Sequence, residues 1–221
     1  MPMPHFFSPM SAAAELIFTI FAVIFCFLIY FKTKETYELT KYKGIKYFRN
    51  AFLFFGLSYA SRLLLGLLFL SREAFEFIIP KEMFILLLIV PVGYFSTIGI
   101  FYLIFSSVWK KFNNTLLLVV GHAAAVLLTV ISFATHSHMM VLYLQIILLA
   151  AAVFLGFKIY PKGKKISEIK ILYLLVAVLW LISLFILDRR APFPLEIKIF
   201  FQLISLAVFI TIYYKISKWM L

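Results

Sequence analysis

Seven long apolar runs, separated by short segments that carry most of the lysines, constrain the fold of this chain more than any other feature. A helix needs about 20 mostly apolar residues to cross the hydrocarbon core of a bilayer, and each run approaches or exceeds that length. Hydrophobic residues make up 65% of the 221 residues, more than the core of a soluble domain can bury. The sequence therefore predicts an all-α, polytopic membrane protein. Its single domain, residues 1–221, would contain seven transmembrane helices at about 11–31, 47–70, 83–109, 115–134, 139–160, 171–187 and 197–214.

Lysine and arginine are distributed unequally between the two sets of alternating segments. Counted together with the adjoining ends of the runs, the segments after the first, third, fifth and seventh runs hold fifteen of these residues, and the other set holds five. Short loops that remain in the cytoplasm carry such an excess of positive charge. We therefore expect a multi-pass protein of the cell membrane with its N-terminus outside and its C-terminus inside. The net charge of +12 follows from this topology, so it does not indicate nucleic-acid binding.

Two similar hexapeptides raise the question of an internal repeat. The segments FLIYFK (27–32) and FKIYPK (157–162) each end a run that is predicted to pass from outside to inside. This similarity is compatible with a 3+1+3 plan, in which the fourth run joins two parallel three-helix units. In a chain so rich in aromatic residues, the match can also arise from composition alone.

Arg62, in the second apolar run, is the most specific candidate for a site. It lies about 12 residues past Asn50, roughly 18 Å along a helix. A guanidinium at such a depth costs about 2.5–3.5 kcal/mol, so we expect it to face the protein interior. Ser58 and Tyr59 share its helical face, and Glu15 in the first run is the expected ion-pair partner. The arginine either binds an anion or substrate in an outward-facing cavity or forms a structural ion pair that fixes helix packing.

Four further polar side chains within the runs are predicted to form a polar interior: His122, Gln145, Gln202 and Ser205. They could line a pocket, or they could form hydrogen bonds between helices. His122 could relay protons or bind haem, or it could remain neutral and hydrogen bond to a tyrosine, a serine or a backbone carbonyl. A bis-histidine haem would need a second histidine within the membrane, and the sequence has none.

Three histidines on the predicted outer side, His136, His138 and His5, could together hold a transition metal. Histidines in short loops are more often simply solvated, and we predict no metal site from them. The sequence also lacks the hydrolase, phosphate-loop and metalloprotease motifs. We therefore predict no catalytic residue, and the cofactor stays open.

The chain resembles two groups of membrane proteins. The count of seven helices with an outside N-terminus is similar to that of microbial rhodopsins, which implies a retinal-binding lysine midway along the seventh helix. Residues Ile199–Tyr214 contain no lysine, and Lys198 lies at the outer edge, so the sequence argues against retinal. The stretch KTKETYELTKYKGIKYFRNAFLFFGLSYASR, Lys32–Arg62, resembles part of uncharacterised archaeal seven-helix proteins. That resemblance implies a membrane location and an archaeal source, and it implies no activity.

Three functional classes remain open from the sequence. The first is a receptor-like or accessory subunit that binds a ligand or lipid between helices and contacts a soluble protein partner through its cytoplasmic loops. The second is a small transporter or channel with a cavity near Arg62. The third is an intramembrane enzyme or redox protein, for which the membrane runs supply few acidic or basic groups.

Overall fold

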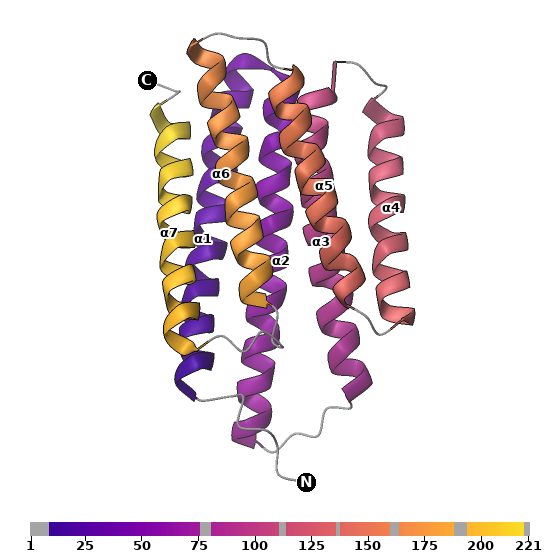
Figure 1. Cartoon of the computed structure of the whole chain (residues 1–221), viewed down its shortest axis with the longest axis vertical. Coiled ribbons are helices and arrows are strands. Elements are labelled where there is room, and N and C mark those ends of the chain that lie inside the picture. Colours follow the sequence, from indigo (N-terminus) through magenta and orange to yellow (C-terminus); the bar gives the residue numbers. More distant parts are fainter. Residues whose placement is uncertain are drawn as a thin grey trace.

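The computed structural model describes residues 9–75, 81–110, 114–135, 138–159, 164–187 and 194–218. These residues form seven helices joined by short connections (Figure 1): α1 (Pro9–Thr40), α2 (Lys43–Phe75), α3 (Lys81–Val108), α4 (Asn114–Ala134), α5 (His138–Ile159), α6 (Lys164–Leu187) and α7 (Leu195–Lys218). Among the described residues, six helices are long and apolar enough to cross a membrane, and the apolar part of α6, Lys170–Ser183, is shorter. The prediction of an all-helical membrane protein is therefore confirmed, although the number of spans is not fixed at seven.

Six of the helices form a closed ring. α2 packs along both α1 and α3, α3 packs along α5, and α6 lies between α5 and α7. The ring closes because α7 packs along α1. α4 lies outside this ring against α3, with a smaller contact to α5 (Figure 1).

The first helix extends beyond its predicted end, at about residue 31, into the segment between the first two apolar runs. α1 continues as a helix to Thr40, well beyond the end of its apolar run. Charged residues support this extension, because Lys32 pairs with Glu35 at 3.0 Å and Lys34 pairs with Glu38 at 3.7 Å. Such pairs stabilise a helix by about 0.2–0.5 kcal/mol each. The first helix is longer than the predicted range of about 11–31 because a fall in hydropathy ends a membrane span without ending the helix.

Only Lys41 and Tyr42 separate α1 from α2. Lys41 has a φ of 53°, the left-handed conformation in which many helices end. Its N–H donates to the carbonyl of Tyr37 at 2.7 Å, and the carbonyl of Tyr42 accepts from the N–H of Ile45 at 3.0 Å. The two helices thus form a helical hairpin. The end of the bundle at which this turn lies, at the top of Figure 1, is called the hairpin end below.

Buried aromatic side chains fill the ring where α2 faces α6. Phe55 of α2 stacks on Trp180 of α6, with ring centroids 4.4 Å apart. Gly99 of α3 leaves room for Phe55, because a Cβ atom at Gly99 would lie 2.5 Å from that ring. Phe209 of α7 packs against Tyr59, the next aromatic residue along α2, with centroids 6.2 Å apart. These contacts place Tyr59 in the centre of the core.

Candidate functional site

Arg62 lies within the apolar span Lys43–Leu68 of α2. Its guanidinium carbon is 5.1 Å from the centroid of the Tyr59 ring, one turn earlier in the same helix. A cation over an aromatic face is stabilised by about 0.5–2 kcal/mol. The side chain is half-buried, and its Nε atom is buried with no hydrogen-bond partner in the described part of the chain. A buried donor without a partner costs about 1–3 kcal/mol, so folding stability alone does not account for this arginine.

Tyr59 holds this position through contacts with three other helices. Its side chain is buried, and its hydroxyl hydrogen bonds with the Ser183 hydroxyl of α6. Its ring packs edge-on against Phe18 of α1, with centroids 6.3 Å apart, and also against Phe209 of α7. The tyrosine beneath Arg62 is therefore fixed from several sides.

Two further polar atoms, on the helices α6 and α7 that pack against Tyr59, are buried without a hydrogen-bond partner among the described residues. One is Nε1 of Trp180, whose ring lies edge-on to Tyr59 at 6.2 Å. The other is the hydroxyl of Ser205, one turn along α7 from Phe209. Nε of Arg62 and Nε1 of Trp180 are thus two unsatisfied polar atoms on side chains in contact with Tyr59, and the Ser205 hydroxyl is a third on a helix that packs against Tyr59. Native proteins leave few such groups, and each one calls for an explanation.

Arg62 and Ser205 lie at similar depths in the bundle. α2 runs away from the hairpin end and α7 runs toward it (Figure 1). Arg62 lies one turn after Tyr59 on α2, and Ser205 lies one turn before Phe209 on α7. Each is therefore one turn farther from the hairpin end than its aromatic neighbour. Arg62, Tyr59, Trp180 and Ser205 are called the Arg62 cluster below. The cluster presents a cation and neutral donors on an aromatic floor, a chemistry that suits a small anion.

The other residues that the sequence placed beside Arg62 have different environments. The Ser58 hydroxyl donates to the Val92 carbonyl of α3 at 3.4 Å. Glu15 has an exposed side chain, and the ion pairs between described side chains do not include it. The structure thus brings Tyr59 beneath Arg62, whereas Ser58 links α2 to α3. The charge of Glu15 lies near enough to act on Arg62, although the two side chains do not form a close ion pair.

His122 lies away from the Arg62 cluster and links α4 to α3. Its Nδ1 is 2.7 Å from the hydroxyl of Tyr94. Its ring contacts those of Phe54 and Tyr102, with centroids 6.2 and 6.1 Å away. A hydrogen bond to a tyrosine is one of the arrangements that the sequence left open for this histidine.

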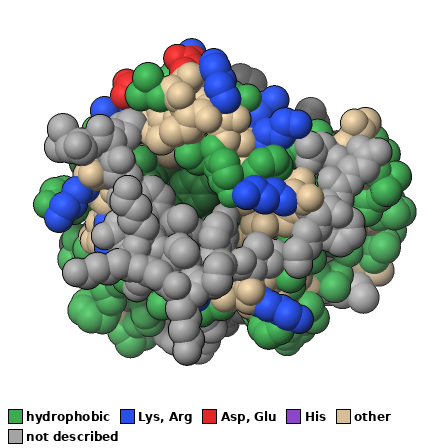
Figure 2. Space-filling view, turned by 90° about the horizontal axis from the view of Figure 1, so that it is seen from above, with side chains coloured by type: hydrophobic (Ala, Val, Ile, Leu, Met, Phe, Trp, Pro, Cys, Tyr) green, Lys and Arg blue, Asp and Glu red, His purple; other side chains and the backbone are tan. Residues whose placement is uncertain are grey.

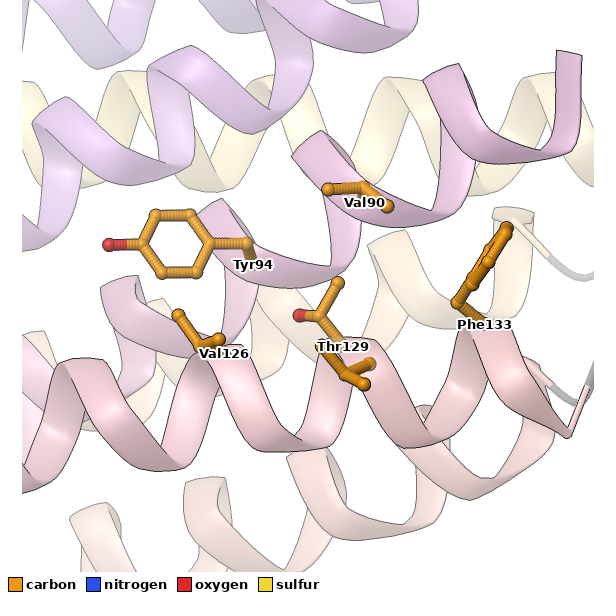
Figure 3. A pocket seen from close by; sticks show the side chains of 6 residues that line it. Val90, Tyr94, Val126, Thr129 and Phe133 are labelled. Carbon is orange, nitrogen blue, oxygen red and sulfur yellow. The ribbon is translucent and has the colours of Figure 1, made fainter. Parts of the chain in front are cut away.

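A groove of about 450 Å³ runs between α3 and α4 beside this pair (Figure 3). It is lined by Val90, Tyr94, Val126, Thr129, Val130 and Phe133. Both hydroxyls of the lining have partners, because Tyr94 bonds to His122 and Thr129 donates to the Ala125 carbonyl at 2.7 Å. The groove therefore offers hydrocarbon contacts and suits an acyl chain better than a polar ligand.

The two buried glutamines differ in their surroundings. Gln145 of α5 donates through Nε2 to the hydroxyls of Ser96 and Thr97 of α3, at 2.6 and 3.0 Å. It therefore joins two neighbouring helices of the ring. Gln202 is buried on α7, nearly one turn farther from the hairpin end than Ser205.

The histidine group suggested by the sequence lies largely outside the described residues. His5 and His136 are beyond the described ranges, and His138 is the first residue of α5. Within those ranges, no three His, Cys, Asp or Glu side chains lie close enough to hold a metal ion.

The sequence reasoning missed Trp180 and Ser183, which complete the surroundings of Tyr59. Both belong to α6, more than a hundred residues from Tyr59 in the chain. The one sequence signal for them is that a tryptophan and a serine stand three residues apart in an apolar run. That spacing marks a common helix face, but it does not say which helix the face meets.

Comparison with known proteins gives one informative result. No protein-family model matches the chain, and no solved structure matches it. An uncharacterized protein of Archaeoglobus fulgidus is 29% identical over 211 residues, which cover 93% of this chain and 92% of that protein. The chain is thus similar, over nearly its whole length, to an archaeal protein whose function is uncharacterised, in agreement with the archaeal resemblance of residues 32–62.

Proposed function

We propose that this protein is a receptor-like or accessory membrane subunit that binds a small anionic ligand at the Arg62 cluster, between α1, α2, α6 and α7. The buried Nε atom of Arg62, which has no partner among the described residues, carries this proposal. A bound anion would accept that hydrogen bond. Ligand binding would thereby remove the energetic cost that the cluster imposes on the unliganded protein.

The helical hairpin offers a route from this site to a partner. We infer that the hairpin end faces the cytoplasm, with the N-terminus outside, because the excess of lysine and arginine lies at that end. α2 carries Arg62 and also forms one arm of the hairpin, so a ligand that moves α2 would move the hairpin with it. A soluble protein that docks on the hairpin could sense that movement. In this view, residues 1–221 act as one domain.

The six-helix ring favours a second candidate, a small transporter or channel. The contact of α3 with α5 and the contact of α7 with α1 are equivalent under a twofold exchange of α1–α3 with α5–α7. α4 stands outside the ring, as a linker helix would in a 3+1+3 repeat. Transporters with such repeats bind substrates between their repeats, and the Arg62 cluster lies at such a junction.

A ligand-dependent thermal shift tests the proposal. The purified chain in mild detergent is heated with sodium acetate, benzoate or sulfate against a sodium chloride background. We expect at least one of these anions to raise Tm, since a ligand at about 100 times its Kd stabilises the folded state by about 2.7 kcal/mol. Arg62→Gln should abolish the increase.

Lys158→Gln is the matched control, because it removes one exposed positive charge near the hairpin end, far from Arg62. It should retain the increase in Tm. An equal increase in Arg62→Gln, or no increase with any of the three anions, contradicts the proposal. If the stabilising anion also crosses liposomes that contain the protein, and Arg62→Gln stops that flux, the transporter is the better description.

A further inference from the structure

Arg49, near the start of α2, has surroundings that the sequence did not reveal. Its guanidinium carbon lies 5.1 Å from the centroid of the Tyr30 ring and 5.4 Å from that of Tyr37. Both tyrosines belong to α1, and Tyr37 lies beyond the predicted end of the first helix. The extension of α1 therefore supplies the second aromatic ring.

Arg49 also retains unused hydrogen-bonding capacity. Its Nε atom is buried and has no partner in the described part of the chain. The carboxylates next to Tyr37 in the sequence are engaged elsewhere, because Glu35 pairs with Lys32 and Glu38 pairs with Lys34. The positive charge of this half-buried arginine is thus not balanced by a carboxylate among the described side chains.

The position of Arg49 matches the boundary of a bilayer. The apolar run of α1 ends at Phe31 and charged residues follow from Lys32. Tyr30 and Tyr37 lie on either side of that change, so the arginine between them is level with it. Lipid phosphates occupy this interfacial region, where the polar headgroups meet the hydrocarbon core.

The surroundings of Arg49 distinguish it from the lysines at the same end. Figure 2, which views the hairpin end, shows Lys and Arg side chains at several points around this face. The lysines Lys41, Lys43 and Lys46 are exposed, so water competes for their charge. A guanidinium held against aromatic rings keeps its in-plane N–H groups ready for two parallel hydrogen bonds to a phosphate.

We propose that Arg49, held by Tyr30 and Tyr37, binds a phosphate oxyanion at the hairpin end of the bundle. The phosphate of an anionic phospholipid and free inorganic phosphate share this chemistry. The site is independent of the Arg62 cluster, because it lies at the other end of the apolar span and uses α1 and α2 alone.

Lipid retention tests this site. The full chain is reconstituted in equimolar phosphatidylglycerol and phosphatidylcholine, extracted in mild detergent and examined by native mass spectrometry. The wild-type protein should retain phosphatidylglycerol in preference to phosphatidylcholine. Arg49→Gln should lower that preference about tenfold, the effect expected when a charge-assisted pair of hydrogen bonds is lost. Arg49→Lys should give an intermediate ratio, because it keeps the charge and loses the planar fork.

Lys158→Gln, which removes one charge near the same end, serves as control and should keep the wild-type ratio. An unchanged ratio in Arg49→Gln overturns the proposal, as does an equal fall in Lys158→Gln. If Arg49→Gln does not fold, Tyr37→Leu replaces it. The loss of the Tyr37 ring should reduce the preference for phosphatidylglycerol, and an unchanged ratio of the two lipids would again reject the site. Added inorganic phosphate that displaces phosphatidylglycerol identifies free phosphate as the ligand, whereas lipid that stays bound identifies the headgroup.

Discussion

Arg49 and Arg62 stand on the same helix and have similar immediate surroundings. Each guanidinium carbon lies 5.1 Å from the centroid of a tyrosine ring, and each Nε atom is buried without a partner among the described residues. They differ in which helix supplies the tyrosines. Arg49 is held by two rings of α1 near the hairpin, whereas Arg62 lies over Tyr59 of its own helix, which is fixed in turn by α6 and α7.

This difference indicates what each arginine can bind. Arg49 lies where the charged hairpin meets the apolar span, so lipid headgroups and solutes both reach it. Arg62 lies deeper, between helices that are far apart in the chain, so its ligand must fit among packed side chains. The two proposed sites therefore use the same guanidinium chemistry, and they differ in the packing around the arginine.

The largest effect that separates the two sites is expected from Gly99→Ala. The new Cβ atom would lie 2.5 Å from the Phe55 ring, so Phe55 must shift against Trp180. Overpacking of this kind costs about 1–3 kcal/mol. The variant should lower Tm and weaken the anion response at Arg62, while the lipid preference that depends on Arg49 stays unchanged.

Gly93→Ala is the matched control on the same helix. A Cβ atom there would lie 3.8 Å from the Thr129 side chain, an ordinary van der Waals contact. Since alanine is favoured over glycine inside a helix by roughly 0.5–1 kcal/mol, this variant should raise Tm slightly. If both variants changed Tm in the same direction, the contact of the new Cβ atom with Phe55 would not explain the effect of Gly99→Ala. The close packing of Phe55 on α3 would then not support the Arg62 cluster.

A smaller effect should separate the ring of Tyr59 from its hydroxyl. Tyr59→Phe removes the hydrogen bond to Ser183, whose hydroxyl still donates to the Leu179 carbonyl at 2.8 Å. The expected loss of stability is about 0.5–1.5 kcal/mol, measured by thermal unfolding. The anion response should persist in Tyr59→Phe and disappear in Tyr59→Leu, because the ring holds the guanidinium. Loss of the response in Tyr59→Phe would instead make the hydroxyl a direct ligand contact.

The sequence predicted the helical fold well because hydropathy reports directly on lipid contact. The apolar runs locate the helices that the structure describes, and each helix contains one of them. The hairpin was the exception. Lys34 and Glu38 stand one turn apart in a segment of low hydropathy, and that spacing supports a helix without indicating one that continues from the membrane.

The candidate site was predictable only where it depends on spacing within one helix. Tyr59 shares a face with Arg62 at the i−3 position, and the structure places it beneath the guanidinium. The partnership with Glu15 rested on depth alone, and the structure places the Glu15 charge near enough to act on Arg62 without a close ion pair. Trp180 and Phe209 come from α6 and α7, and only the packing of the ring brings them to Tyr59.

The smallest expected effect concerns the turn that supports Arg49 but not Arg62. Lys41 adopts a left-handed conformation, with a φ of 53°, that disfavours side chains with a Cβ atom. This conformation costs roughly 1–2 kcal/mol in a residue other than glycine, and the greater flexibility of glycine in the unfolded chain offsets part of any gain. Lys41→Gly should therefore stabilise the hairpin by a few tenths of a kcal/mol up to about 1 kcal/mol. Hydrogen exchange of the amides around Tyr37 should slow, while exchange around Arg62 should not change, because the hairpin can be stabilised without repacking the ring. Slower exchange at both places would mean that the hairpin and the Arg62 cluster unfold together, and the two arginines would then belong to one cooperative unit.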